Sequence, residues 1–130
     1  MPSVMLDKEF GDLVQLGIEA VPLEFRRKIN NVAITFADEP SREQLISNNV
    51  PAGSTLFGLY EGIPLTARGG NYTMVVPDRI TIFKKPILNA SQGNLQRTKD
   101  IVIETVWHEV GHHFGLSENQ IRSLTEKRKQ

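Results

Sequence analysis

Cysteine is missing from this chain of 130 residues. Its absence excludes disulfide bonds, thiolate nucleophiles and thiolate metal ligands together. The absence also fits a reducing compartment, and residues 1–9 lack the basic and apolar stretches that make a signal peptide. We therefore expect the protein to be cytoplasmic.

Long hydrophobic runs and an excess of one charge are missing as well. No apolar run approaches the roughly 20 residues that a membrane-spanning helix needs. Fifteen Lys and Arg residues balance fifteen Asp and Glu residues, so the formal net charge is +0. The sequence therefore predicts neither a membrane nor a nucleic acid as a partner. The basic end of the chain, with Arg122 and residues 127–129, is expected to be a solvated tail.

The remaining composition is that of an ordinary globular protein. Hydrophobic residues make up 39% of the chain and charged residues 23%, which argues against wholesale disorder. A length of 130 residues suits one domain, and no repeat or low-complexity linker divides the sequence. We expect a single domain over residues 1–130.

Hydrophobic periodicity predicts the secondary structure. Apolar residues recur at steps of three and four over residues 7–20, as in a helix, whereas residues 32–36 and 79–83 alternate as half-buried strands do. The expected elements, in chain order, are helices over 7–20 and 23–28, a strand over 32–36, a helix over 41–47, strands over 55–60 and 79–83, and helices over 95–113 and 118–127. This order predicts an α+β fold.

Turn residues mark the expected boundaries between these elements. Residues 61–64 are expected to form a hairpin turn or a bulge, and residues 68–71 a loop. Lys84, Lys85 and Pro86 are expected to stop the last strand, since proline cannot donate to a strand ladder. Which strand lies at the edge of the sheet does not follow from the sequence.

All three histidines of the chain lie within six residues, at positions 108, 112 and 113. His108 and His112 are four apart on a predicted helix, so their imidazoles lie about 40° apart on one face and can share a metal ion. Neutral imidazole nitrogens suit zinc. Glu109 stands beside the pair, where its carboxylate can take a proton from a water molecule. The pattern predicts a zinc site with Glu109 as the general base.

The rest of this helix is consistent with a histidine face turned towards a cleft. An apolar stripe lies about opposite His108 and His112 on the helical wheel, and we expect it to pack on the core. The residues of the stripe are Val102, Ile103, Val106, Trp107, Val110 and Phe114. A metal-free histidine pair with satisfied hydrogen bonds is the alternative.

A catalytic zinc ion usually has three protein ligands, and Glu118 is the candidate for the third. Gly115 stands where a helix C′ residue adopts a left-handed conformation, and it would turn the chain sharply. Glu118, three residues later, could then reach back to the metal. Alternatively, Glu118 is only a first-turn carboxylate that complements the dipole of the last helix, which Ser117 and Gln120 begin with a capping box.

Three neighbours of the motif have less distinctive roles. His113 points about 100° away from His112. We expect it to support a ligand, to cap the helix or to face solvent rather than to bind the metal. Glu104 lies one turn before His108 and is either a hydrogen-bond partner of an imidazole or a solvated carboxylate. Gly111 costs helix propensity, so a close packing contact or substrate approach is expected there.

Residues 108–118 (HEVGHHFGLSE) resemble the extended HExxHxxGxx(H/D) site of metzincin peptidases. The chain as a whole resembles the short bacterial zincin-like metallopeptidases of minimal size, also in residues 58–66 (GLYEGIPLT) and 77–83 (PDRITIF). The resemblance implies a small twisted sheet packed against the active-site helix, flanked by N-terminal helices and one short C-terminal helix. It also implies that zinc is held by His108, His112 and the acidic residue at position 118.

The chain departs from the metzincin pattern in two respects. Metzincins have His or Asp where this chain has Glu118, whose longer side chain could ligate differently. Only twelve residues follow the site, which leaves no room for a methionine-containing turn beneath the metal or for a lower subdomain. The resemblance therefore supports the zincin architecture more strongly than vigorous proteolysis.

These patterns predict a zinc metallopeptidase that cleaves peptide bonds. Its substrate would be a peptide or protein segment held in extended form along an edge strand. Tyr60, Tyr72 and Arg79 are possible donors to the oxyanion, although each is also a candidate for a structural role. The main alternative is a catalytically weak or inactive zincin-fold module with a binding or regulatory role. A zinc hydrolase acting on other substrates is a third hypothesis.

Overall fold

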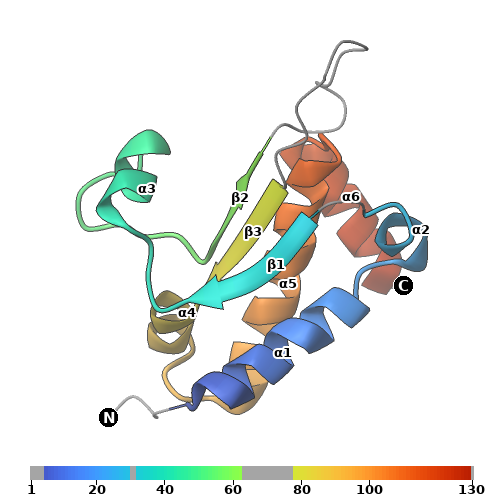
Figure 1. Ribbon diagram of the computed structural model, residues 1–130. Helices are drawn as coiled ribbons and strands as arrows, with labels where there is room; N and C mark the ends of the chain where they lie inside the picture. Colours follow the sequence, from blue (N-terminus) through green and yellow to red (C-terminus); the bar gives the residue numbers. More distant parts are fainter. Residues whose placement is uncertain (1–4, 30–31, 63–77, 130) are drawn as a thin grey trace.

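The computed structural model of the chain describes residues 5–29, 32–62 and 78–129, which form an α+β fold (Figure 1). Helices supply most of the regular structure, and a small sheet lies across them. The helices are α1 (Asp7–Glu19), α2 (Leu23–Arg26), α3 (Arg42–Ser47), α4 (Lys84–Ser91), α5 (Leu95–His113) and α6 (Glu118–Lys129). The strands are β1 (Val32–Ala37), β2 (Gly58–Glu61) and β3 (Asp78–Phe83).

The sheet is mixed, with the strand order β1-β3-β2. β3 pairs in parallel with β1 and antiparallel with β2, with Ile80 opposite both Ile34 and Tyr60. The central strand β3 is buried along most of its length, whereas β1 alternates between half-buried and exposed residues over most of its length. Within the described residues β2 therefore lies at one edge of the sheet, beside α5.

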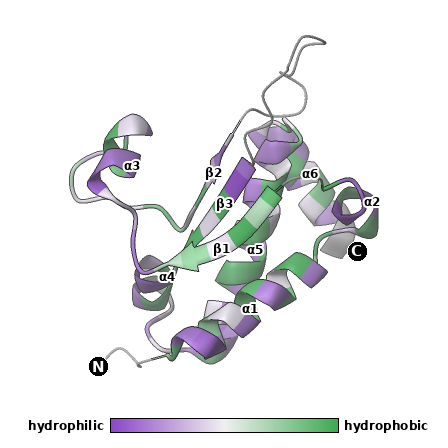
Figure 2. Cartoon of the chain, viewed as in Figure 1, coloured by the Kyte–Doolittle hydropathy of each residue, from purple (hydrophilic) through white to green (hydrophobic). Residues whose placement is uncertain are grey.

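The hydrophobic core lies between the sheet, α1 and α5. Figure 2 shows β1 coloured largely as hydrophobic and α1 carrying both hydrophobic and hydrophilic residues, as an amphipathic helix should. α1 packs closely on α5 at Gly17, where an added Cβ would lie 2.9 Å from Val106 Cγ2. The buried core consists of Phe10, Val14, Val21, Ile80, Ile82, Ile87, Val102, Val106, Trp107, Val110 and Ile121.

The expected helices and strands are present with small shifts, and one helix was missed. The second strand spans 58–61 instead of 55–60. Residues 84–86 do end β3, but they also begin α4, because a proline in the first helical turn sacrifices no intrahelical hydrogen bond. Half of the predicted turn at 61–64 and all of the predicted loop at 68–71 lie outside the described residues. The single-domain organisation stays a prediction.

The burial of α5 confirms most of its predicted apolar stripe. Val102, Val106, Trp107 and Val110 are buried, whereas the remaining members of the stripe, Ile103 and Phe114, are only partly so. Across the described part of the chain, none of the helices is both long and apolar enough to cross a membrane.

The N-terminal helix contributes to the core, so truncating its buried phenylalanine should destabilise the protein. Phe10 is fully buried, with its ring 5.3 Å from that of Phe36. We expect Phe10→Ala to lower the free energy of unfolding by about 3–5 kcal/mol, measured by urea denaturation. Leu16→Ala, at a position with 41% of the residue exposed, is the control and should cost less than about 1 kcal/mol. Equal costs would contradict the placement of α1.

Candidate active site

The last turns of α5 bring His108, Glu109 and His112 together. One ligand atom of each lies within 4.8 Å of the others, and the two imidazole rings are 4.7 Å apart at an angle of 81°. Both histidines are half-buried, whereas Glu109 is buried. A helix therefore presents two imidazoles and a carboxylate at one spot, as the four-residue spacing predicted.

Glu118 reaches the same spot from the start of α6. Its Oε1 lies 3.1 Å from His108 Nε2 and 3.4 Å from His112 Nε2. The chain turns there through Gly115, which has a φ of 74°, and Leu116 N donates to Gly111 O across the helix end. The glycine turn predicted from the sequence is therefore present.

The beginning of α6 is fixed by the predicted capping box. Gln120 N donates to Ser117 Oγ over 3.1 Å, and Ser117 N donates to Gln120 Oε1 over 2.7 Å. Glu118 is thereby the first residue of a capped helix. Its direction towards the histidines follows from the local chain and does not need a distant contact.

The distances among these groups suit a zinc ion. Tetrahedral zinc with ligands at about 2.0–2.1 Å places neighbouring ligand atoms about 3.3–3.4 Å apart. The two distances from Glu118 Oε1 to the imidazole nitrogens, 3.1 and 3.4 Å, lie close to this spacing. Two neutral imidazoles with one carboxylate are also a common donor set for catalytic zinc. The residues present therefore fit the metal.

The imidazole of His112 has an environment that keeps it in the form a metal needs. Burial and the neighbouring His108 lower the pKa of His112 below 6.5, and the carboxylate of Glu118 only partly opposes this. This shift of the pKa favours the neutral form of the ring. Only neutral imidazole can ligate zinc.

Glu109 is held by a contact with the sheet. Its Oε1 accepts a hydrogen bond of 2.9 Å from the backbone N–H of Tyr60 in β2. Burial raises the pKa of Glu109 above 4.5, although the nearby His108 and the N–H of Tyr60 partly offset this effect. A carboxylate with a raised pKa is better matched to accepting and releasing a proton near neutral pH.

A glycine lets β2 come close enough to make that contact. An added Cβ at Gly58 would lie 2.6 Å from Thr105 Cγ2 and 3.3 Å from Glu109 Cγ. Real Cβ atoms essentially never approach so closely, so any other residue at position 58 would push β2 away from α5. The side of β2 that faces away from β3 thus runs directly beside the candidate base.

The site opens into a cleft of about 620 Å³. Its floor includes His108, Glu109 and His112 of α5, and β2 forms one side. Asn48, at the end of α3, and Leu116, in the turn before α6, also line the cleft. Backbone and side chains from four parts of the chain therefore enclose the space next to the histidines.

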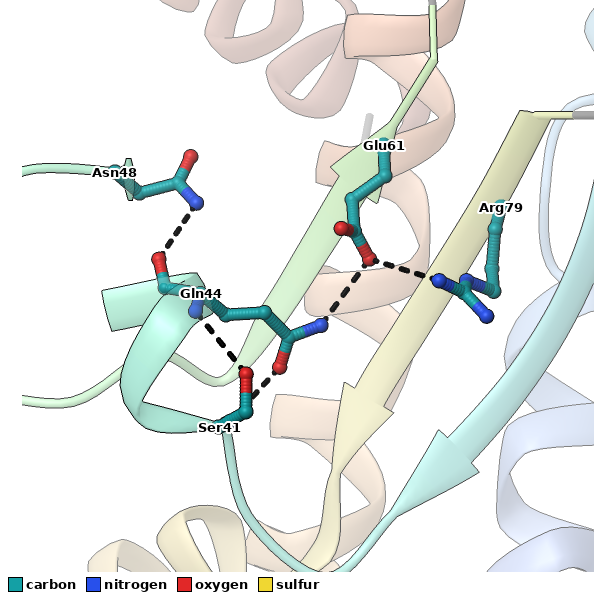
Figure 3. A network of polar contacts seen from close by, with 5 residues as sticks. All are labelled: Ser41, Gln44, Asn48, Glu61 and Arg79. Carbon is teal, nitrogen blue, oxygen red and sulfur yellow. Dashed lines mark hydrogen bonds and ion pairs between the residues drawn. The ribbon is translucent and has the colours of Figure 1, made fainter. Parts of the chain in front are cut away.

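A polar network ties α3 to the sheet beside this cleft (Figure 3). Glu61 accepts a hydrogen bond of 3.1 Å from Gln44 Nε2 and lies 3.6 Å from Arg79 Nη2. Gln44 also closes a capping box with Ser41 and accepts from Asn48 Nδ2 over 2.8 Å. The pair of Glu61 and Arg79 is partly exposed, so it contributes at most about 1 kcal/mol. Its role is geometric, since it connects α3 to two strands.

The neighbours of the motif lie as follows. His113 does not face solvent as one of the expectations allowed; it is buried, and its Nδ1 lies 2.8 Å from Asp78 Oδ2. Glu104 is exposed, which is consistent with the solvated alternative. Gly111 makes the expected close contact, because an added Cβ would lie 2.6 Å from Ile121 Cδ1 in α6.

Two of the three possible oxyanion donors have polar side-chain groups that are engaged by residues other than the two cleft-lining histidines. The Tyr60 hydroxyl donates to Asp78 Oδ2 over 2.7 Å, and Arg79 pairs with Glu61. Tyr72 lies outside the described residues. Tyr60 contributes to the site through its backbone N–H, which donates to Glu109. The chemistry of a tyrosine side chain does not predict this contact.

Asp78 was not recognised as a candidate site residue, although the sequence contains a signal for it. In β3 it lies in phase with the buried Ile80 and Ile82, so the alternation of the strand places a carboxylate on the buried face. A buried carboxylate needs a partner. That partner, His113, is 35 residues away in the sequence and could not be paired with it by spacing alone.

Comparison with known protein families gives a match over most of the chain. The model of a family described as zincin-like metallopeptidase matches residues 29–128. The matched range contains the three strands, α5 and the four residues of the site, but begins after α1 and α2. No match to a curated protein was found.

The contact of Gly111 with Ile121 should control how closely Glu118 approaches the histidines. We expect Gly111→Ala to push α6 outward and to weaken zinc binding about tenfold, measured by competition with a chromophoric chelator. Adding Ile121→Ala, which removes both clashing atoms, Cδ1 at 2.6 Å and Cγ1 at 2.7 Å, should recover most of that loss. Weakening that the second substitution does not relieve would contradict this explanation.

Proposed function

The chain belongs to the zincin-like metallopeptidase family, and on this premise we propose that it is a zinc-dependent peptidase with Glu109 as its general base. His108, His112 and Glu118 would hold the metal. The observation that carries the proposal is the position of Glu118 Oε1, which lies 3.1 and 3.4 Å from the two imidazole nitrogens. Membership of a peptidase family implies peptide or protein substrates.

Glu109 is positioned to move the protons of the reaction. When bound, zinc supplies Lewis acidity that lowers the pKa of a water molecule and polarises the scissile carbonyl. Glu109 takes a proton from the attacking water as its oxygen bonds to the carbonyl carbon, and then donates it to the amine nitrogen as the C–N bond breaks. The N–H of Tyr60 holds one carboxylate oxygen throughout, which leaves the other for this work.

The edge of β2 would hold the substrate in extended form. Phe83 N donates to Phe57 O, so the alternation of an antiparallel pair turns the backbone groups of Leu59 and Glu61 towards β3 and those of Gly58 and Tyr60 outward. An extended peptide could pair with the outward backbone groups of Gly58 by β-augmentation. Such a peptide would run past the histidines on α5.

The cellular setting of this activity stays a prediction. Residence in the cytoplasm rests on the cysteine-free composition, which suits a reducing compartment.

Metal content tests the proposed ligands directly. The purified protein should contain about one zinc ion per chain by mass spectrometry, and His112→Ala should lose it. Glu118→Ala should weaken zinc binding by at least about tenfold, since even partners of ligands commonly cost that much. Glu104→Ala, which removes an exposed glutamate on α5, the helix that carries the two histidines, is the matched control. A parent protein that takes up no stoichiometric zinc at neutral pH would contradict the proposal.

Glu109→Gln separates a peptidase from an inactive module of the same fold. Glutamine keeps an oxygen that can accept from Tyr60 N–H but cannot take a proton. We expect cleavage of a quenched fluorescent peptide library to fall by about 10²–10⁴-fold with zinc content unchanged. Glu104→Gln should cleave as the parent does. A parent protein that binds zinc stoichiometrically but cleaves no peptide would favour the binding or regulatory module.

A further inference from the structure

A buried polar cluster lies next to the candidate site but does not belong to it. Asp78 and His113 are each only 1% exposed, and His113 Nδ1 lies 2.8 Å from Asp78 Oδ2. The hydroxyl of Tyr60 donates to the same oxygen over 2.7 Å. A carboxylate is costly to bury unless it is well paired, so this arrangement needs an explanation beyond packing.

The cluster joins the three elements that surround the site. Asp78 is the first residue of β3, His113 is the last residue of α5, and Tyr60 belongs to β2. The chain leaving β2 passes directly over the carboxylate, because an added Cβ at Gly62 would overlap Asp78. The end of β2 is therefore held against Asp78 by both a side chain and the backbone.

The Tyr60 ring is fixed on two sides. Its hydroxyl bonds to Asp78, and its ring makes a T-shaped contact with the imidazole of His113 at a centroid distance of 5.7 Å and an angle of 67°. A tyrosine ring has two rotatable torsions, so anchoring its far end restricts the backbone from which it extends. The backbone N–H of the same residue is the group that bonds to Glu109 Oε1 over 2.9 Å.

We propose that Asp78 is a positioning residue for Glu109 and acts through Tyr60. Asp78 anchors the Tyr60 hydroxyl, the anchored ring sets the backbone of β2, and the backbone N–H then holds one oxygen of Glu109. His113 completes the device by donating to the carboxylate of Asp78 and by packing against the Tyr60 ring. The role of these contacts in catalysis rests on the proposed function, whereas the contacts themselves are features of the structure.

Amide hydrogen exchange in the full-length protein tests the chain of contacts without requiring activity. The N–H of residue 60 points away from β3, so Glu109 is its partner among the described residues, and Glu109→Ala should raise its exchange rate. Tyr60→Phe keeps the ring but removes the hydroxyl. We expect it to raise exchange at residue 60 by at least about tenfold, with the amides of β3 unchanged.

Thr98→Val is the matched control. It removes another buried hydroxyl, one that lies 2.6 Å from Ser91 Oγ and far along α5 from the site. Exchange at residue 60 should stay at the parent rate in this variant, although a comparable hydrogen bond is lost. If Tyr60→Phe leaves exchange at residue 60 unchanged, or if Thr98→Val raises it equally, the proposal is overturned.

Turnover provides the second readout, once a cleaved peptide is known. Tyr60→Phe and Asp78→Asn should lower kcat about tenfold or more while KM and zinc content stay near the parent values. A purely structural clamp would instead lower stability and leave the kcat of the folded protein unchanged. A parent protein without peptidase activity would overturn the proposed function, and the exchange rates would still decide the role of Asp78. If Asp78→Asn does not fold, Tyr60→Phe carries both readouts.

Discussion

The close approach of β2 to α5 is the constraint on which the site depends. Gly58 leaves room for it, since any Cβ there would meet Thr105 and Glu109. Gly111 does the same on the opposite flank, where α6 packs against α5 through Ile121. One helix thus accepts a strand on one side and a second helix on the other. The strand brings an N–H to Glu109, and the second helix brings a carboxylate to the histidine pair.

Two acidic groups near the end of α5 are buried for different purposes. Glu109 keeps one hydrogen bond and has a pKa raised by burial, so it remains able to exchange a proton. Asp78 Oδ2 is contacted by both the Tyr60 hydroxyl and His113 Nδ1. The first arrangement suits a reacting group and the second a fixed one. Tyr60 contacts both, with its backbone on one and its side chain on the other.

Local patterns predicted most of what lies between residues 95 and 120. The length of α5, the left-handed Gly115 and the capping box of Ser117 with Gln120 all depend on near neighbours, and each is present. The contacts of Tyr60 with Glu109 and of Asp78 with His113 could not be predicted in this way. They depend on strand order and on how β3 lies against α5, which periodicity does not encode. The helix α4, whose first turn contains Pro86, was missed because proline was interpreted only as the end of a strand, whereas it also suits the first turn of a helix.

The candidate metal ligands lie close together in the sequence, whereas the hydrogen-bond partner of Glu109 lies far from it. His108, His112 and Glu118 lie within one helix end and the next helix start, so they can assemble from a short continuous segment. The N–H that holds Glu109 comes from 49 positions earlier and requires the sheet. Closing a long loop costs more conformational entropy than closing a short one, so the contact between Tyr60 and Glu109 is entropically more expensive than the contacts of Glu118 with the histidines. Binding of a metal by the local segment would therefore not by itself orient Glu109.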